Sequence, residues 1–290
     1  MYFSRVRIQP DIHQETQMAK VLADSVYNIH RLLWDLFPGQ KQRNFLYREE
    51  IAREQLGYQG GARGESLYYL VSSSAPSSQS PFFAVETRRY EPQLQPDEAL
   101  RFELRANPVV TKNGKKHDVV MDAQQTFLKL LCEELGLLSH LQGTPEKKEY
   151  KNVLLTHGGQ RLDSRLTDLL DGDYRYAERL DQKLTPREKL EWALRAEIDN
   201  TLDEWMAKQG KQNGFTIVKD THGNLKLQNS AYQWHALTGK AAKGKKSGFS
   251  AVDFTGDLVV SDVEAFKKSL FNGIGRSKAF GCGLMLVKRI

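Results

Sequence analysis

The sequence predicts an α+β protein made of two successive βαββαβ units, and three observations support this prediction. Alternation of side-chain character over residues 2–9 predicts an opening strand. Apolar residues at three- and four-residue spacing predict a long helix over 14–37, which Pro38-Gly39 ends. Residues 262–273 and 282–290 repeat the helix-to-strand order at the end of the chain. The order β-α-β-β-α-β is that of a ferredoxin-like unit.

The first unit is expected to span residues 1–96. Short strand-like runs follow the helix around 45–48 and 67–72. A Ser/Pro-rich turn and a short element from Phe82 then lead to a strand expected near 89–94.

The second unit is expected to span residues 97–290, opening with a strand in LRFELRANPVV from Leu100. Two further strands are expected at 214–220 and 250–260. Residues 121–138 and 186–209 both have a helical pattern, so the position of the first helix of this unit stays open. We therefore expect a mostly helical insertion at about 122–195.

Composition bounds the class of protein. The 290 residues are 40% hydrophobic and 27% charged, as in ordinary soluble domains. No run approaches the roughly 18 apolar residues of a membrane span, and the first residues show no signal-peptide pattern. Cys132 and Cys282 lie far apart and outside any CxxC motif, which argues against a disulfide framework or a structural zinc. We expect a cytoplasmic protein without metal, cofactor or membrane partner.

The charge of the chain is unevenly distributed. The net charge of +6 is by itself weak evidence for a nucleic-acid partner. Residues 145–209 hold 12 Lys/Arg and 14 Asp/Glu, however, and the rest of the chain holds 30 and 22. The positive charge therefore lies outside that segment, which is expected to face away from any nucleic acid.

The first helix carries candidate catalytic residues. On a helical wheel Tyr27 and Arg31 share one side, with Lys20 and Trp34, and His30 lies at the rim of the apolar face. With an ordinary pKa near 6.5, His30 could take or give a proton while a ribose 2′-hydroxyl attacks a phosphate. Tyr27 could orient the RNA, and nearby cations could stabilise phosphoryl charge. The alternative is a solvated or capping histidine, which is common at this spacing.

A glycine-rich stretch, GIGRSKAFGCG, covers residues 273–283. Its possible RNA-contacting residues are Gly273, Gly275, Arg276, Ser277, Lys278, Gly281 and Gly283. Glycines let backbone N–H groups approach a phosphate, and the basic side chains add charge. The stretch follows a helix and precedes a strand, which excludes a dinucleotide fingerprint and a Walker loop. A tight turn that needs positive φ angles explains the glycines equally well.

Two lysine-rich loops are candidate RNA-binding segments. The first, 111–117, holds Lys112, Lys115 and Lys116. The second, 238–246, holds Lys240, Lys243, Lys245 and Lys246 between two expected strands. Such hairpins suit the phosphates of an RNA helix, although either loop could simply be solvated.

Several motifs, in order along the chain, resemble the CasE family of CRISPR repeat-RNA endoribonucleases of type I-E Cascade, within the RAMP superfamily. They are MYFSRVRI, Y-x-x-H-x-L-L-W-D-L-F-P (27–38), F-L-Y-R-x-E (45–50), L-R-A-N-P (104–108), W-x-x-x-Q-G-x-x-x-G-F (205–215) and the glycine-rich stretch. The resemblance covers nearly the whole chain except about 122–195.

The resemblance implies two ferredoxin-like (RRM-like) domains and recognition of the stem-loop in a CRISPR repeat transcript. Cleavage would fall at the 3′ base of the stem without a metal, leaving a 2′,3′-cyclic phosphate. The mature crRNA would be retained with other Cascade subunits. The family's catalytic histidine and tyrosine fall on His30 and Tyr27, and its basic hairpin falls around 240–246. A non-catalytic RNA-binding scaffold subunit is the alternative from another class.

Overall fold

The computed structural model describes residues 1–9, 26–51, 66–112, 114–237 and 248–290. The first part of the expected long helix, with Lys20, lies outside the described residues. So does the basic segment that carries Lys240, Lys243, Lys245 and Lys246. No helix in the described ranges combines the length and apolarity needed to cross a bilayer.

The chain divides into two compact units. The first, here the core unit, comprises Met1–Pro108 and Ala207–Ile290, and the second, here the helical unit, is Val109–Met206. The helical unit is longer than the insertion expected at 122–195. The unit begins earlier than expected, at Val109, because a β-hairpin leads directly into its first helix, whose N-cap is Asp118. The expected boundary between two ferredoxin-like domains near residue 96 stays a prediction.

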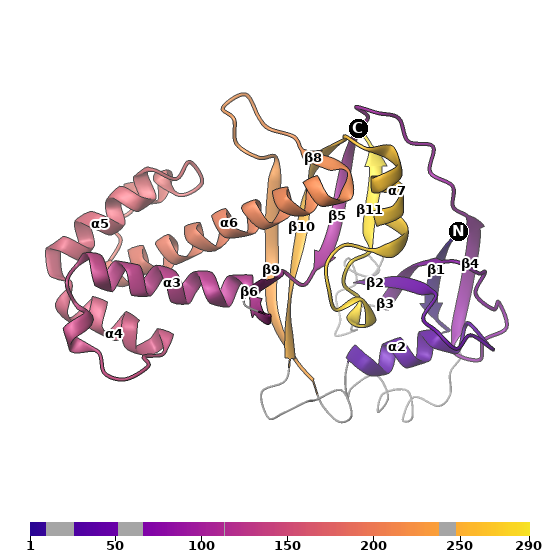
Figure 1. Cartoon of the computed structure of the whole chain (residues 1–290), viewed down its shortest axis with the longest axis horizontal. Coiled ribbons are helices and arrows are strands. Elements are labelled where there is room, and N and C mark those ends of the chain that lie inside the picture. Colours follow the sequence, from indigo (N-terminus) through magenta and orange to yellow (C-terminus); the bar gives the residue numbers. More distant parts are fainter. Residues whose placement is uncertain (10–25, 52–65, 113, 238–247) are drawn as a thin grey trace, which may run out of the picture. The chain divides into compact units, whose positions relative to one another are not determined.

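The first sheet of the core unit has the strand order of a ferredoxin-like unit. Its strands are β1 (Tyr2–Ile8), β2 (Phe45–Ile51), β3 (Ser66–Ser72) and β4 (Phe83–Arg89), in the antiparallel order β2-β3-β1-β4. Helix α2 (Val26–Trp34) follows β1 and packs its apolar side on this sheet (Figure 1). The fold class predicted from the sequence is confirmed here.

Two details of the first unit differ from the expectation. The fourth strand is Phe83–Arg89, so the strand placed near 89–94 was wrong; Phe83 is buried opposite Ile8, whereas 90–94 has no regular structure. Helix α2 ends at Trp34 and not at residue 37, since the amides of Leu36 and Phe37 bond to carbonyls three residues back. Residues 73–82, all described, contain no helix, so the second helix of a full βαββαβ unit is absent there.

The core of the first sheet explains these elements. Its buried members are Val6, Ile29, Leu33, Leu36, Phe37, Phe45, Tyr47, Tyr68, Leu70 and Phe83. Three of them recur at positions 29, 33 and 36, which places them on one side of α2 and the turn after it. Each fully buried Leu, Ile or Phe contributes about 1.5–3 kcal/mol relative to exposure.

The second sheet of the core unit has the same topology. Its strands are β5 (Ala99–Ala106), β8 (Phe215–Ile217), β10 (Gly248–Val260) and β11 (Met285–Arg289), in the order β11-β5-β10-β8. A further strand, β9 (Leu227–Ala236), pairs antiparallel with β10. Helix α7 (Val263–Asn272) begins at Asp262, whose side chain accepts a hydrogen bond from the amide of Ala265, and ends at Gly273.

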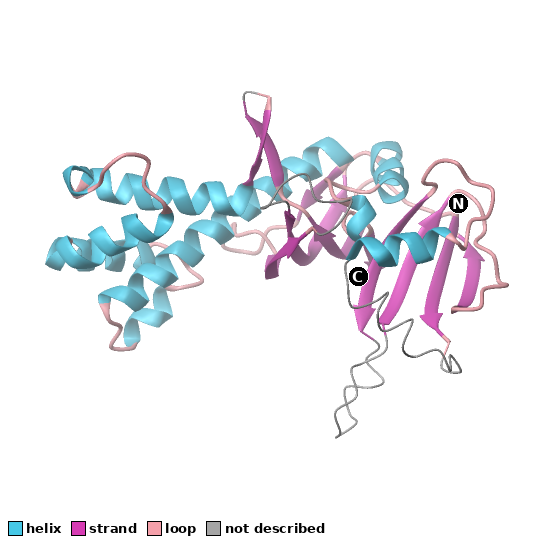
Figure 2. Ribbon diagram, turned by 90° about the horizontal axis from the view of Figure 1, so that it is seen from below, coloured by secondary structure: helices cyan, strands magenta, loops and turns pink. Residues whose placement is uncertain are grey.

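The helical unit consists of a hairpin and a helix bundle (Figure 2). Strands β6 (Val109–Lys112) and β7 (Lys115–Asp118) form the hairpin. The helices are α3 (Val119–Glu134), α4 (Lys147–His157), α5 (Gly159–Asp171) and α6 (Pro186–Asn213), with short 3₁₀ turns η2 (Leu138–His140) and η3 (Ala177–Asp181). Helix α6 continues past the last residue of this unit. The leucine-rich core of the helical unit includes Leu128, Leu154, Leu166 and Leu190.

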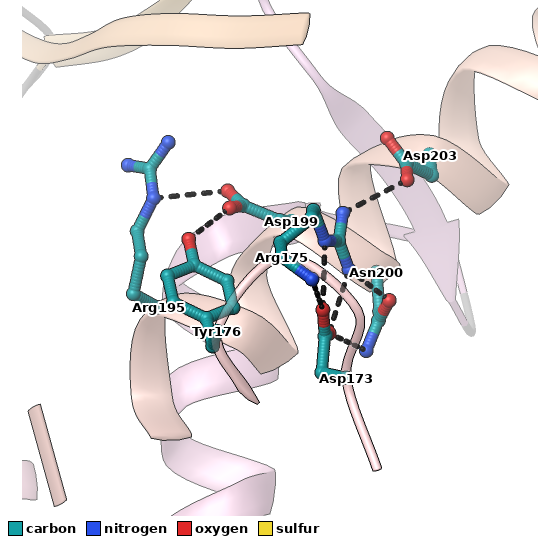
Figure 3. A network of polar contacts seen from close by, with 7 residues as sticks. All are labelled: Asp173, Arg175, Tyr176, Arg195, Asp199, Asn200 and Asp203. Atoms are coloured by element: carbon teal, nitrogen blue, oxygen red, sulfur yellow. Dashed lines mark hydrogen bonds and ion pairs between the residues drawn. The ribbon is translucent and has the colours of Figure 1, made fainter. Parts of the chain in front are cut away.

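A network of charged side chains ties the segment after α5 to α6 (Figure 3). The guanidinium of Arg175 donates to both carboxylate oxygens of Asp173, at 3.0 and 2.9 Å, and to Asp203 at 3.1 Å. The Tyr176 hydroxyl donates to Asp199, which also forms an ion pair with Arg195. These contacts satisfy charges that the bundle would otherwise bury alone.

Candidate active site

Helix α2 and strand β2 enclose His30 in aromatic rings. The imidazole centroid lies 5.4 Å from those of Trp34 and Phe45 and 6.2 Å from that of Tyr47. His30 is only 7% exposed, so other side chains cover the edge of the apolar face of α2, where the sequence places this residue. The cause is tertiary, because the side chains of Phe45 and Tyr47, two residues apart on β2, both point toward α2.

The surroundings of His30 change its acid–base chemistry. Burial, together with the positive charge of Arg43, lowers the pKa of His30 to about 4. The expectation of an ordinary value near 6.5 is therefore corrected. In the free protein the imidazole is neutral at pH 7. A neutral imidazole can accept a proton, so this environment suits a general base.

Strand β2 and the residues just before it contribute two groups, Tyr47 and Arg43, that the sequence analysis did not single out as site residues. Tyr47 is buried, and its hydroxyl donates to the carbonyl of Ala279 at 3.2 Å. Burial and the nearby Glu49 raise the pKa of Tyr47, so its phenol stays protonated. Arg43 lies just before the strand and interacts electrostatically with both His30 and Tyr47. The only signal for them was the F-L-Y-R motif, which contains Tyr47 and follows Arg43.

The glycine-rich stretch is a tight turn built on positive φ angles. Gly273, Gly275, Gly281 and Gly283 have φ between 76° and 95°. A Cβ on Gly283 would lie 2.9 Å from the carbonyl oxygen of Ile274. The backbone alone thus explains the four glycines, as the second interpretation of this stretch predicted. The roles predicted for Arg276, Ser277 and Lys278 in binding RNA stay predictions.

This turn is fixed to both sheets of the core unit. The side-chain amide of Asn107, just after β5, donates to the hydroxyl of Ser277. The backbone amide of Gly283 donates to the carbonyl oxygen of Arg105 at 2.7 Å. The short helix η5 (Lys278–Phe280) contacts α2 and β2 (Figure 1). Burial and the charge of Arg43 lower the pKa of Lys278. The turn therefore brings Lys278 close to Arg43, whose charge also acts on His30.

A stack of rings connects the same turn with the β9–β10 hairpin. Phe280 of η5 stacks on Phe249 with centroids 4.9 Å apart, and Phe249 stacks on His235 at 4.9 Å. The two strands frame the segment with Lys240, Lys243, Lys245 and Lys246, as the sequence predicted, although the lysines themselves lie outside the described residues.

The remaining candidates lie on α2 and on the β6–β7 hairpin. Arg31 is exposed on α2, and Tyr27 lies in the first turn of that helix; the role of the Tyr27 side chain stays a prediction. Lys112, Lys115 and Lys116 are exposed on the β6–β7 hairpin of the helical unit. Lys112 forms an ion pair with Asp122, so it is partly neutralised.

The charges around His30 suit an anion. Within the described ranges, the charge of Arg43 acts on His30 and Lys278, the Tyr47 phenol acts on Arg43, and the carboxylate of Glu49 acts on Tyr47. Across the described ranges, no three His, Cys, Asp or Glu side chains are grouped so that they could hold a metal ion.

Two antiparallel sheets with ferredoxin-like strand order define a tandem ferredoxin-like protein. The family model for CRISPR-associated proteins matches residues 1–289, and the chain therefore belongs to this family. It is similar to the CRISPR system Cascade subunit CasE of Escherichia coli (strain K12), with 31% identity over 155 residues, which are 51% of this chain and 69% of that protein. The resemblance inferred from the sequence motifs is confirmed.

Solved structures show the same fold. One of the CRISPR endoribonuclease Cse3 bound to a 19-nucleotide RNA matches with a TM-score of 0.58 and 19% identity, covering 99% of this chain and 100% of that one. Another, of Thermus thermophilus Cse3 bound to an RNA representing a pre-cleavage complex, matches with a TM-score of 0.56 and 18% identity, covering 99% and 98%.

Proposed function

We propose that this protein is a metal-independent endoribonuclease that binds the stem-loop of CRISPR repeat transcripts and cleaves at the 3′ base of the stem. Membership of the CRISPR-associated family and the similarity to CasE support the substrate class. The observation that carries the reaction is the position of His30, a neutral imidazole beside two cations and a protonated phenol.

In the proposed reaction the RNA supplies its own nucleophile. The 2′-hydroxyl of the nucleotide before the cut loses its proton to His30 and forms a bond to phosphorus. The bond from phosphorus to the 5′-oxygen breaks, and that oxygen takes up a proton. The products are a 2′,3′-cyclic phosphate end and a free 5′-hydroxyl. A proton acceptor placed in this way contributes about 10²–10⁴-fold in rate.

RNA binding is assigned to the core unit. We assign the phosphates of the stem to Lys240, Lys243, Lys245 and Lys246, on the segment between β9 and β10, and those near the cut to Arg276 and Lys278. Tyr27 and Arg31 are assigned to the same RNA from the first helix. The mature crRNA would stay bound as this protein acts with other Cascade subunits in the cytoplasm.

The second candidate is an RNA-binding scaffold without cleavage activity. The burial of His30 favours it, because a histidine that is 7% exposed has little contact with solvent in the free protein. The two functions share the fold and the basic segments and differ only in the chemistry at His30.

A cleavage assay in excess EDTA separates them. We expect the purified protein to cut its cognate repeat RNA at one position under these conditions. A matched RNA with a 2′-deoxy nucleotide before the cut should bind with unchanged affinity and remain intact. Binding of both RNAs without any cleavage would support the scaffold. Normal cleavage of the deoxy RNA would rule out attack by the 2′-hydroxyl.

A further inference from the structure

Arg43 is a basic residue beside the candidate site to which no role has yet been given. It lies two residues before Phe45, whose ring is 5.4 Å from that of His30, and four before Tyr47. Residues two apart along an extended chain point to the same side. Phe45 and Tyr47 therefore both face α2, and the charge of Arg43, which lies just before the strand, acts on His30 and Tyr47. Arg43 is also exposed, so a ligand can reach it.

Lys278 approaches the same place from another part of the chain. The carbonyl of the next residue, Ala279, accepts the hydrogen bond of the Tyr47 hydroxyl, and η5 contacts both α2 and β2. Arg43 and Lys278 interact electrostatically with each other, as Arg43 does with His30. Like charges held this close repel, and an anion bound among them would relieve that repulsion.

Building on the proposed function, we propose that Arg43 is a catalytic residue whose guanidinium binds the reacting phosphate of the RNA, together with Lys278 and beside His30. The planar guanidinium can donate to both non-bridging oxygens of one phosphate. During the step described above, charge accumulates on these two oxygens as the bond from O2′ to phosphorus forms. Arg43 keeps its own proton and stabilises that charge.

The same cation influences when His30 can work. Without RNA, Arg43 adds to the effect of burial and helps to keep the imidazole neutral. Among the described residues, Lys278 from η5 and Tyr47 from β2 also face this place, and the carboxylate of Glu49 on β2 helps to keep Tyr47 protonated. A bound phosphate offsets the charge of Arg43, so the imidazole can hold the proton it receives. Loss of Arg43 should raise the pKa of His30 in the free protein.

The test compares Arg43→Gln with Lys41→Gln, which removes an exposed cation two residues earlier. Single-turnover cleavage is measured from pH 5 to 9, and affinity is measured with the 2′-deoxy RNA. We expect Arg43→Gln to lower the rate about 10²–10³-fold while affinity changes by less than about fivefold. The acid limb of its rate profile should move to higher pH, as should the NMR titration of His30. Lys41→Gln should behave as the wild type.

Arg43→Lys keeps the charge and loses the planar fork, so it should recover part of the rate. A rate for Arg43→Gln within about threefold of the wild type would overturn the proposal. So would a defect that saturating RNA removes, because Arg43 would then act in binding alone. An unchanged His30 titration would show that Arg43 does not act on the imidazole. If the wild type itself does not cleave, the proposed function fails as well, which this series distinguishes from a failure at Arg43 alone.

Discussion

The cluster around His30 and the network around Arg175 are both partly buried groups of charged side chains, but their charges balance differently. Arg175 is surrounded by the carboxylates of Asp173 and Asp203. In the His30 cluster, Arg43 and Lys278 have no carboxylate among the groups that shift their pKa values. Arg175 thus has carboxylate partners within the protein, whereas Arg43 and Lys278 are proposed to take an anion from outside. This difference indicates a structural role for one and a binding role for the other.

The pKa shifts within the Arg175 network agree with this interpretation. Arg175 pairs with both aspartates, yet the pKa of Asp173 is lowered and that of Asp203 is raised to about 6. Asp173 accepts two bonds from the guanidinium and one from the backbone amide of Arg175. Asp203 accepts one, and burial and the neighbouring Asp199 disfavour its charge. Asp203 is therefore less completely paired by Arg175 than Asp173 is, which agrees with its raised pKa.

The same contrast holds for the two units as wholes. The helical unit has 15 Lys/Arg and 18 Asp/Glu, a net charge of −3, whereas the rest of the chain has 27 and 18, a net of +9. RNA is therefore expected to bind the core unit, and its binding should depend more on the cations of that unit than on those of the helical unit.

Replacing His30 should have the largest effect. We expect His30→Ala to lower the cleavage rate about 10²–10⁴-fold and leave the affinity for 2′-deoxy RNA nearly unchanged, because the proton acceptor is lost but the cations remain. His30→Gln fills the site better and guards against an effect of the cavity. His222→Ala, at an exposed turn of the core unit, is the matched control. Cleavage at the wild-type rate by both His30 variants would show that the candidate active site is wrong.

Breaking the Arg175 network should affect stability and not cleavage. Arg175→Met leaves Asp173 and Asp203 without their cation, so the free energy of unfolding should fall by about 3–5 kcal/mol in urea titrations. Arg161→Met, an exposed arginine of α5, should change it little. If Arg175→Met instead abolished RNA binding while the protein stayed folded, the structural assignment of this network would have to be abandoned.

Neutralising the lysines of the two hairpins should show which of the two units binds the RNA. Changing Lys240, Lys243, Lys245 and Lys246 to Gln should weaken RNA binding and reduce the slope of log affinity against log salt by up to about 3, since each phosphate contact contributes about 0.7–0.9. The corresponding change of Lys112, Lys115 and Lys116 in the helical unit should have the smaller effect. Equal effects would mean that the helical unit also contacts the RNA.

Asp203 should make stability depend on pH. Because its pKa is raised in the folded protein, the folded state holds a proton that the unfolded chain has already lost, and stability falls as pH rises from about 4 to about 6. Asp203→Asn removes this titration and should weaken the dependence by roughly 2 kcal/mol over that range. Thermal unfolding at pH 4.5 and 7.5 measures the effect, with Asp171→Asn as the exposed control. Parallel curves for wild type and Asp203→Asn would contradict the raised value.

Periodic patterns predicted most elements well. The strand at the start, the helix 262–273 and the closing strand agree with β1, α7 and β11 to within a few residues. Errors arose where local patterns were weak, as for the strand placed at 89–94, where the strand ends at Arg89. The two helical patterns at 121–138 and 186–209 could not be ranked, because periodicity does not tell which sheet or bundle a helix joins. In the structure the former is α3 of the helical unit and the latter belongs to α6, which extends past it.

Periodicity and motifs read in order along the chain were enough to predict the two-sheet fold, the family resemblance and His30 as a candidate catalytic residue. The burial of His30, its pKa of about 4 and the presence of Arg43, Tyr47 and Lys278 around it became known only from the three-dimensional packing. Lys278 lies more than 200 residues from the others in the chain. Burial and long-range charge depend on distances in space, which local patterns do not contain.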